Sequence, residues 1–511
     1  MEVQSWLETL LSDRPTGRDF EMPVLLAADA DRVTEYVFET PGLPEMRGAS
    51  ALLKWLNLDG IQGLLEEAGV PAAFVDDTPR GCLVYAAGGG VLALVPQTKA
   101  EPLREAMERL YPGHTGAATT TCVKVDADVS QVRDGFGELV KQAGQKLRTA
   151  KGQKTALPVF ELLPFIRRCD ACRKRPAVEF LPPYPGEPPE ARCRVCTAKR
   201  ERGREDRLSK EHRELGVGRA PRDLEEIAEA SNGYIGVVYA DGNSLGDWFQ
   251  QTGKVMEYRE RSRGVQHAVN TALLGALREN CAVHQHPFEV ILVGGDDVLL
   301  IVPACDALPV AHTVCCCFEQ EMAAERCTMS AGVVIAEHHT PAYFLRRLVE
   351  DLLKNAKKRV KEEGGKKEQV SAVDFLVLKG QGTRSAEQAR ERVILGSETL
   401  ILNHGPYTLE ELDRLLGQVR QGKRVGFPLS QLHALRAALR QGRQASALAF
   451  LYQQERARSD EARDFLNDFA NQWSVQTRET PPWRESRKLR GGATEYRTAW
   501  ADLADIWDFV R

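Results

Sequence analysis

Two adjacent aspartates follow two glycines in VGGDDVLLIVP, residues 293–303, with apolar runs on both sides. Glycine pairs and aspartates are common in the turns of β-hairpins, so the segment predicts a hairpin with Asp296 and Asp297 at its tip. A third acidic residue, Asp241, ends another apolar run in GYIGVVYADGNSLG, residues 233–246. If these strands are neighbours in one sheet, the three carboxylates converge. Hard oxygen ligands of this kind suit Mg2+ or Mn2+.

Mutual repulsion favours a metal site over a purely structural turn. Three carboxylates held close together cost stability unless a cation lies among them. Two divalent ions at such a site can activate an attacking 3′-hydroxyl and stabilise a pyrophosphate leaving group. Glycines beside the aspartates let the backbone approach a nucleotide, loop N–H groups can hold phosphates, and lysines on a following helix either neutralise phosphate or form a solvated face. The candidate nucleotide-binding residues are Gly242, Asn243, Ser244, Gly294, Gly295, Lys354 and Lys357.

Two CxxC pairs predict a second metal site, of a different kind. Cys169 and Cys172 are followed, after twenty residues, by Cys193 and Cys196. This spacing is typical of a tetrathiolate Zn2+ site, and because four thiolates close the coordination sphere we expect the site to be structural. Many basic residues surround it. They either contact phosphate backbones or form a solvated surface, since nearby acids dilute their charge. They are Arg167, Arg168, Arg173, Arg192, Arg194, Lys199, Arg200, Arg202 and Arg204.

The sequence contains an internal repeat. PVLLAADADRV, residues 23–33, is similar to the strand that ends in Asp241, and VYAAGGGVLALVP, residues 84–96, aligns with ILVGGDDVLLIVP, residues 291–303. The alignment places Gly88, Gly89 and Gly90 opposite Gly295 and the two aspartates. A duplicated α/β domain explains the pattern, with a first copy that kept the glycine turn and lost both turn carboxylates.

The pattern of apolar residues predicts the elements that position these residues. We expect strands at 234–240, 288–293, 298–302, 328–335 and 370–377, and helices at 247–279, 307–323 and 341–361. This alternation, with a hairpin in the middle, fits a ferredoxin-like α/β sandwich, and residues 23–128 have a similar pattern.

The pattern of residues beyond residue 380 indicates a different fold class from that of the preceding α/β domains. Thr408 and Glu411 form a capping-box pattern before an apolar stripe, and the chain ends in TEYRTAWADLADIWDFVR, which has helical periodicity. We therefore predict an α+β multidomain chain: a first α/β domain over 1–150, a zinc-binding insert over 151–225, a second α/β domain over 226–382 and an all-α domain over 383–511.

Composition excludes several classes of protein. The chain has 68 Lys and Arg against 72 Asp and Glu, a net charge of −4, so no global field attracts nucleic acid. The N-terminus lacks a basic signal-peptide region, and no apolar run reaches about 18 residues, so we expect no membrane segment. Twelve cysteines without secretory features predict a reducing, cytoplasmic location.

The set of motifs resembles a known family. VVYADGNSLG, VGGDDVLLIVP, MSAGVVIAEHHTP, LLKNAKK and AVDFLVLKG resemble the second palm domain of Cas10 (Cmr2 or Csm1), the large subunit of type III CRISPR-Cas effector complexes. LLAADADRVTEYVFETPGLPEMRGASALL resembles its first palm domain. The resemblance implies two cyclase-like palm domains, a zinc module and a helical domain. It also implies metal-dependent synthesis of cyclic oligoadenylates from ATP, switched on by target RNA.

The resemblance assigns roles to residues and suggests partners. It makes Asp241, Asp296 and Asp297 metal ligands, places Ser244, Gly294 and Gly295 beside the nucleotide, and places Ser330 near a base. The implied partners are Cas5-, Cas7- and Cas11-like subunits, crRNA and target RNA. The first palm motif begins within about 25 residues of Met1, and the chain has no His-Asp dipeptide, so we expect no HD nuclease domain and no DNase activity. Two alternatives stay open: a catalytically silent scaffold and a diguanylate-cyclase-like enzyme.

Overall fold

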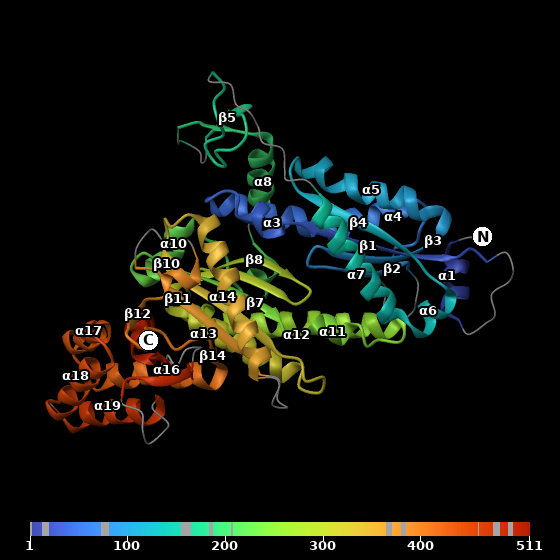
Figure 1. Cartoon of the computed structure of the whole chain (residues 1–511). Helices are drawn as coiled ribbons and strands as arrows, with labels where there is room; N and C mark the ends of the chain where they lie inside the picture. Colours follow the sequence, from blue (N-terminus) through green and yellow to red (C-terminus); the bar gives the residue numbers. More distant parts are fainter. Residues whose placement is uncertain are drawn as a thin grey trace.

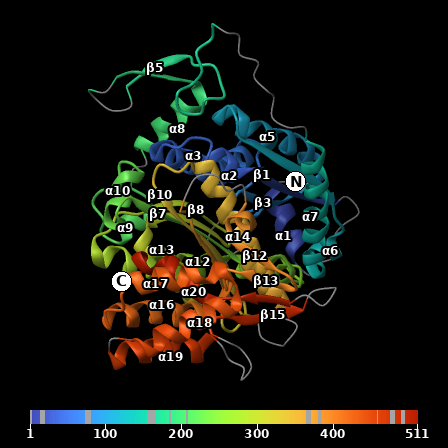
Figure 2. The same ribbon diagram turned by 60° about the vertical axis from the view of Figure 1, so that its left-hand side comes forward.

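Two α/β units, an insert and a C-terminal unit follow one another along the chain (Figures 1 and 2). The computed structural model describes most of the sequence. The described residues are 3–12, 20–72, 81–154, 165–182, 186, 188–205, 208–363, 370–379, 385–457, 459–473, 481–488 and 494–511.

The first unit contains a four-stranded sheet in the order β2-β3-β1-β4, with β1 antiparallel to both of its neighbours. Together with the intervening helices this is the ferredoxin-like topology that the sequence predicts. Its strands are β1 (Pro23–Asp31), β2 (Leu83–Ala87), β3 (Gly90–Pro96) and β4 (Thr119–Asp126). Its helices are α1 (Val3–Leu11), α2 (Val33–Val37), α3 (Leu43–Trp55), α4 (Ile61–Glu67), α5 (Gln97–Thr115), α6 (Val129–Asp134) and α7 (Phe136–Gln153).

The second unit repeats this topology in a larger sheet, ordered β14-β11-β10-β7-β9-β8. Its strands are β7 (Tyr234–Gly242), β8 (Glu289–Gly294), β9 (Asp297–Pro303), β10 (Met329–Glu337), β11 (Ala372–Val377) and β14 (Tyr407–Thr408). Its helices are α11 (Leu245–Phe249), α12 (Val255–Asn280), α13 (Ala304–Glu321) and α14 (Ala342–Glu363). The predicted strands of this region and the helices predicted at 307–323 and 341–361 are confirmed to within a few residues, whereas the helix predicted over 247–279 is two helices, α11 and α12, separated by residues 250–254.

Alternation along the strands explains how both faces of this sheet are covered. Val238 and Ala240 belong to the core that contains α12 and α13, whereas Ile235 and Val237 belong to the core that contains α14. The second of these cores also includes residues of α2, α3 and the cysteine-rich insert. A buried ion pair reinforces the junction of the two units, because Arg47 Nε on α3 donates to Glu289 Oε1 on β8 at 2.9 Å. The two units therefore share a hydrophobic core.

The insert lies against α3 of the first unit (Figure 1). It contains β5 (Glu179–Leu181), β6 (Glu190–Arg192) and α8 (Arg194–Glu205), followed by α9 (Lys210–Glu214) and α10 (Leu224–Ala228). Glycines at the helix crossing let the two backbones touch. A Cβ on Gly48 of α3 would lie 1.6 Å from the carbonyl oxygen of Lys199, and one on Gly203 of α8 would lie 2.0 Å from the carbonyl oxygen of Pro44. Any side chain at either position would push α8 away from the first unit.

The prediction of an all-α C-terminal domain is wrong. Residues after 383 include a four-stranded sheet, ordered β12-β13-β16-β15, beside the expected helices. Its strands are β12 (Arg392–Leu395), β13 (Glu398–Ile401), β15 (Arg484–Lys488) and β16 (Thr494–Arg497). The start of the predicted last helix is therefore strand β16, and the helix itself is shorter. The helices are α15 (Ala386–Ala389), α16 (Leu409–Arg424), α17 (Leu429–Ala438), α18 (Arg443–Glu455), α19 (Asp460–Trp473) and α20 (Ala499–Ile506).

The predicted capping box is confirmed at the start of α16. Glu411 N donates to Thr408 Oγ1 at 3.2 Å, and Thr408 N donates to Glu411 Oε2 at 3.0 Å. In the part of the chain that the structure describes, every helix is too short or too polar to cross a membrane.

Candidate functional site

Three neighbouring strands bring the aspartates together at one edge of the second sheet. Asp241 is the penultimate residue of β7, Asp296 lies in the turn after β8, and Asp297 begins β9. Strands β7 and β9 pair with Ala240 opposite Val298, so Asp241 and Asp297 are neighbours across the ladder. Asp296 is close enough to Asp241 for a side-chain hydrogen bond between them. We call Asp241, Asp296 and Asp297 the aspartate cluster.

Burial and mutual repulsion make the aspartate cluster unfavourable without a cation. Burial raises the pKa of Asp296 well above its usual range, and the negative charges of Asp241 and Asp297 raise it further. Burial, followed by the charge on Asp241, raises the pKa of Asp297 to about 7. A folded protein that holds carboxylates in this state gains stability from any cation that binds among them.

In this conformation a lysine supplies the positive charge. The Lys357 ammonium group forms an ion pair with Asp241 and donates to the carbonyl oxygen of Gly242 at 2.8 Å. The Tyr239 hydroxyl donates to Asp297 Oδ1 at 3.0 Å. The structure places Lys357 on α14, where it pairs with Asp241, and its role in neutralising phosphate stays a prediction.

The residues around the aspartate cluster fit a divalent ion, after some rearrangement. Asn243 is 8% exposed, and its Oδ1 atom has no hydrogen-bond partner among the described residues, which leaves a buried hard oxygen two residues after Asp241 in the chain. The ligand atoms of the three aspartates do not all lie within 4.8 Å of one another, unlike those of two other groups of three or more Cys, His and Asp residues in the described chain. Binding of an ion would therefore draw the carboxylates together and displace Lys357 from Asp241.

The first unit contributes directly to this edge through its own glycine turn. A Cβ on Gly88 would lie 2.8 Å from the carbonyl oxygen of Gly294, and one on Gly294 would lie 2.5 Å from the Gly88 nitrogen, so the two hairpin tips touch. The hydroxyl of Tyr85 lies 2.8 Å from the position of a Cβ on Gly295. Burial raises the pKa of Tyr85, and the charges of Asp296 and Asp297 raise it further. The contact between the two hairpin turns therefore explains why glycines occupy the turn of the first unit.

The hairpin contact predicts that Gly88→Ala is more damaging than an ordinary glycine replacement. Gly88 has φ +60°, so alanine adds strain of about 1–2 kcal/mol together with a clash against Gly294. Gly69→Ala is the matched control, because Gly69 has φ +71° and no atom within 4 Å of an added Cβ. We expect Gly88→Ala to lower the melting temperature more than Gly69→Ala and to reduce turnover. If the two variants lowered the melting temperature and the turnover equally, the contact between the two hairpin turns would not be important for stability or turnover.

A second carboxylate–lysine pair, which was not predicted from the sequence, lies in the first unit. Asp29 lies two residues before the end of β1, much as Asp241 lies one residue before the end of β7, and Lys151 Nζ on α7 donates to Asp29 Oδ2 at 2.6 Å. Burial raises the pKa of Asp29, against the opposing charge of Lys151. The signal was present, because Thr-Ala-Lys at 149–151 corresponds to Asn-Ala-Lys at 355–357. The duplication therefore extends to the lysine that neutralises the strand-end aspartate.

Four other predicted residues have distinct positions. Ser244 is exposed and has φ +56°, and Gly295 N donates to Gln266 Oε1 at 3.2 Å, so both stay candidates for contact with a ligand. Lys354 is 74% exposed and pairs with Asp351 rather than with the aspartate cluster. The prediction for Ser330 needs correction: it lies opposite Asp241 in the register, but it is 0% exposed and its Oγ accepts a hydrogen bond from Ala372 N. A fully buried hydroxyl has no surface for a nucleotide base.

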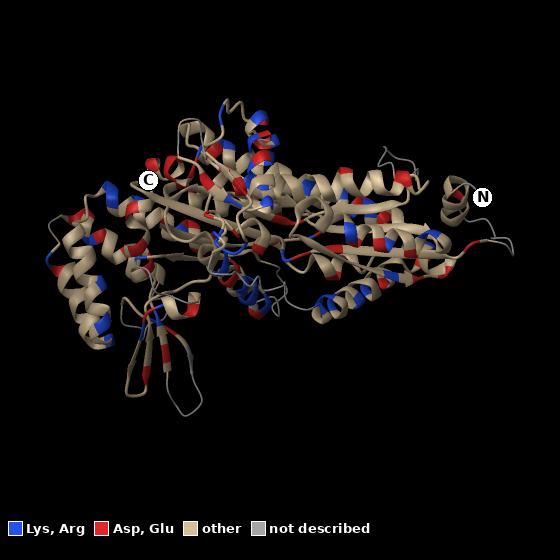
Figure 3. Ribbon diagram, turned by 90° about the horizontal axis from the view of Figure 1, so that it is seen from above, with Lys and Arg blue, Asp and Glu red and all other residues tan. Residues whose placement is uncertain are grey.

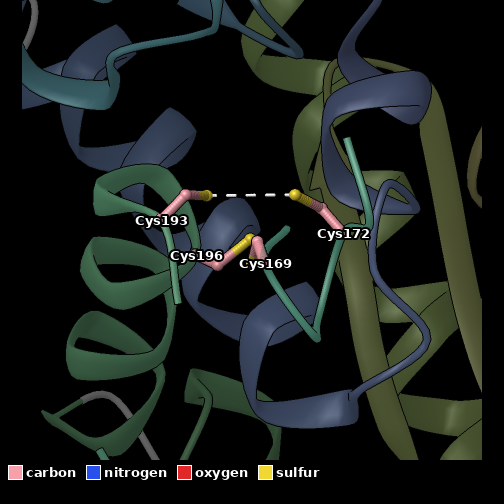
Figure 4. Close-up of side chains that lie close together, drawn as sticks. All are labelled: Cys169, Cys172, Cys193 and Cys196. Atoms are coloured by element: carbon pink, nitrogen blue, oxygen red, sulfur yellow. Dashed lines mark hydrogen bonds between the residues drawn. The ribbon is translucent and has the colours of Figure 1, made fainter. Parts of the chain in front are cut away.

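The four cysteines of the insert converge, as their spacing predicts. Their Sγ atoms all lie within 4.8 Å of one another, all four residues are buried, and the Sγ atoms of Cys172 and Cys193 are 3.9 Å apart (Figure 4). Cys193 directly precedes α8 and Cys196 lies in its first turn, whereas Cys169 and Cys172 lie in the segment before β5. Four free thiols in this arrangement fit a tetrahedral Zn2+ ion. We call these residues the cysteine cluster.

Basic residues near the cysteine cluster are tied to the first unit. Lys199 is 0% exposed; its Nζ donates to the carbonyl oxygen of Tyr36 at 2.6 Å and pairs with Glu39 at 3.2 Å. Arg175 pairs with the same Glu39 at 2.9 Å and lies 4.0 Å from the Cys172 sulfur. Arg200 is also buried and pairs with Glu45 at 2.8 Å. For Lys199 and Arg200, the phosphate-contact hypothesis is therefore wrong.

Comparison with known proteins places this geometry in a family. Residues 234–368 match the family model of the Cas10/Cmr2 second palm domain. A search of curated proteins gave no match. Solved structures that share the fold include a Csm1-Csm4 cassette in complex with one ATP (TM-score 0.59, 16% identity, covering 96% of this chain and 70% of that chain). The apo Csm1-Csm4 cassette has a TM-score of 0.57 and 17% identity, covering 98% of this chain and 71% of that chain. The cassette in complex with cA4 has a TM-score of 0.56 and 17% identity, covering 90% of this chain and 72% of that chain.

The fold and the family match define a multidomain α/β protein with a palm domain at residues 234–368. At 16–17% identity, the likeness to the solved structures concerns the fold. The family match assigns residues 234–368 to the second palm domains of Cas10/Cmr2, and the fold that the chain shares with the Csm1-Csm4 structures agrees with it.

Proposed function

We propose that this chain is the catalytic large subunit of a type III CRISPR effector complex and converts ATP into cyclic oligoadenylates. The observation that carries the proposal is the convergence of Asp241, Asp296 and Asp297 at the edge where the two palm-like units meet. Csm1-Csm4 structures that share the fold contain ATP, cA3 or cA4, which supports ATP as substrate and an oligoadenylate as product.

In this proposal the chain positions two ATP molecules for one phosphoryl-transfer step. A 3′-oxygen of one adenosine forms a bond with the α-phosphorus of the next ATP, and the bond to the β-phosphate oxygen breaks to release pyrophosphate. Bound Mg2+ or Mn2+ ions would lower the pKa of the attacking hydroxyl and balance the charge on the leaving group. The aspartate cluster and Asn243 would hold these ions. Lys357, released from Asp241, would then neutralise part of the triphosphate charge.

The proposed domain roles follow from the same geometry. The first palm-like unit, with its glycine turn, supports the aspartate-bearing turn of the second, and the cysteine cluster holds a structural Zn2+. Solved relatives are bound to Csm4, so we infer that this chain also assembles with other effector subunits, and through them with crRNA and target RNA. A silent scaffold does not need a buried aspartate cluster, which costs stability without a cation.

Nucleotide choice and RNA dependence separate the candidate functions. The complex of this chain with its partner subunits and crRNA would be incubated with ATP or GTP and a divalent ion, with and without matching target RNA. We expect pyrophosphate release from ATP that needs both the divalent ion and the target RNA. Release from GTP alone would support a diguanylate-cyclase-like enzyme, and no release from either nucleotide would support a scaffold.

A further inference from the structure

A second group of possible metal ligands lies outside the cysteine cluster, where β8 begins and β9 ends. His286 lies in the segment before β8, and Cys305 and Asp306 lie in the first turn of α13, which follows β9 directly. One ligand atom from each of the three residues lies within 4.8 Å of those of the other two. In the described chain, the cysteine cluster is the one other group of Cys, His and acidic residues with this property. We call these three residues the mixed cluster.

The side chains of the mixed cluster contact one another. His286 Nδ1 lies 2.5 Å from Asp306 Oδ2, and Cys305 Sγ lies 3.5 Å from Asp306 Oδ1. On the other side of the ring, Arg511 NH2 lies 3.0 Å from His286 Nε2. Because arginine only donates, Nε2 accepts this hydrogen bond, and a neutral ring then carries its proton on Nδ1 and donates it to Asp306. A metal ion bound at Nδ1 would take the place of that proton.

Cys281, the residue after α12, supplies a fourth possible ligand. Burial raises the pKa of its thiol, and the charges of Asp306 and Cys305 raise it further, so it lies close to both side chains. The main chain holds it there, because His286 N donates to the Cys281 carbonyl oxygen at 3.0 Å and closes the turn between α12 and β8. Cys281, Cys305 and Asp306 are buried, and the His286 side chain is 11% exposed, so these are not solvated surface groups.

We propose that the mixed cluster and Cys281 bind a Zn2+ ion that fastens the open end of the β8–β9 hairpin. Two thiolates, one imidazole and one carboxylate make a complete tetrahedral ligand set for zinc, so we expect the ion to be structural. The aspartate-bearing turn is the opposite end of the same hairpin. Its strands have six and seven residues, which puts the two sites about 20 Å apart. This ion is therefore separate from the ions proposed at the aspartate cluster.

A buried ion pair beside two apolar thiols is the alternative reading of these residues. It accounts for His286 and Asp306, but it gives no reason for two thiols to lie beside the same carboxylate. Hydrogen bonds among the ligands do not argue against a metal ion, because two thiols of the cysteine cluster also contact each other, at 3.9 Å. Lys and Arg are interspersed with Asp and Glu over the described ribbon, so binding rests on the ligand atoms rather than on a large negative surface (Figure 3).

Zinc binding here has a cost that the cysteine cluster does not have. The ion replaces the two thiol protons and the Nδ1 proton of His286. Nε2 then takes up one proton from water, and Arg511, which can no longer donate to it, moves away. Arg511 is the exposed last residue of the chain, so it is free to move. We therefore expect an exchangeable ion, and protein isolated without added metal holds zinc at the cysteine cluster alone.

Titration of the full chain with Co2+, after isolation with zinc in its cysteine cluster, tests the site. Co2+ bound through thiolates gives intense sulfur-to-cobalt charge-transfer absorption, which carboxylate ligands alone do not give, so ions at the aspartate cluster are not detected. We expect about one equivalent of Co2+ to produce this absorption and Zn2+ to remove it. Cys305→Ser and His286→Gln should each weaken binding by about tenfold or more. Cys327→Ser, which changes another buried free thiol of the second unit, is the matched control and should leave binding unchanged.

The melting temperature provides a second measurement. Added Co2+ should raise it in the wild-type chain but not in Cys305→Ser, and values without added metal check that the variants fold. Three results would overturn the proposal. They are a titration without charge-transfer absorption, absorption that both Cys305→Ser and His286→Gln leave intact, and absorption that is lost in Cys172→Ser but kept in Cys305→Ser. The last result would assign the ion to the cysteine cluster. Synthesis of oligoadenylates is tested separately, because these measurements involve no nucleotide.

Discussion

Replacing Asp296 and Asp297 together by asparagine is expected to abolish product formation while making the metal-free protein more stable. The loss of two metal ligands removes several kcal/mol of transition-state stabilisation, which corresponds to a rate decrease of about 10³-fold or more. Both residues are held in a site where burial opposes their charge, so neutral amides of the same size relieve repulsion around Asp241. We expect the gain in the free energy of unfolding to be about 1 kcal/mol or more.

Two measurements check this prediction. Turnover of ATP would be measured in the complex with target RNA, and the melting temperature of the full chain would be measured in EDTA. Asp351→Asn is the control, because Asp351 lies on α14, is 39% exposed and pairs with Lys354 outside the aspartate cluster. A double variant that keeps wild-type turnover would remove the aspartates from the proposed mechanism. An inactive variant with a lower melting temperature would show that the turn carboxylates stabilise the fold, contrary to our account.

Loss of the proposed zinc ion is expected to have the largest effect on stability. Cys172→Ser removes one ligand, and structural zinc sites contribute folding free energy directly, on the order of several kcal/mol. The effect should spread beyond the insert, because Lys199 and Arg175 link it to Glu39 of the first unit and its cysteines belong to a core shared with both palm-like units. Hydrogen exchange should therefore increase in α3 and α8 as well as around the cysteines.

Cys316→Ser provides the matched control, since Cys316 is a half-buried free thiol on α13 outside the cysteine cluster. The wild-type chain and this control should each carry about one zinc ion, and Cys172→Ser should carry much less. Wild-type protein without zinc, or a Cys172→Ser variant with unchanged stability, would contradict the assignment.

Strong local patterns made most of the second palm-like unit predictable. Alternating apolar runs bounded by glycine and aspartate placed β7, β8 and β9, and the helical stripe placed α14, each within a few residues. The convergence of Asp241 with the glycine–aspartate turn also followed, because adjacent strands end at one sheet edge. The spacing of the CxxC pairs indicated a compact cluster for the same reason: short loops limit how far the thiols can separate.

Features that depend on distant partners were not predictable from local pattern. Strand β15 (Arg484–Lys488) has no apolar alternation and forms because β16 offers a pairing edge. Lys199 and Arg200 look solvated in sequence, but they are buried because Glu39 and Glu45 reach them from more than 150 residues away. The contact between Gly88 and Gly294 belongs to the packing of the two units, and no single hairpin contains a signal for it.

Mass spectrometry of the nucleotides formed from ATP is the most direct test of the proposed function. The complex of this chain with its partner subunits and crRNA would be supplied with ATP, a divalent ion and matching target RNA. We predict a ladder of linear oligoadenylates that ends in one or more cyclic products, absent when target RNA or the divalent ion is omitted. Unchanged ATP in a complex that binds its target RNA normally would contradict the account.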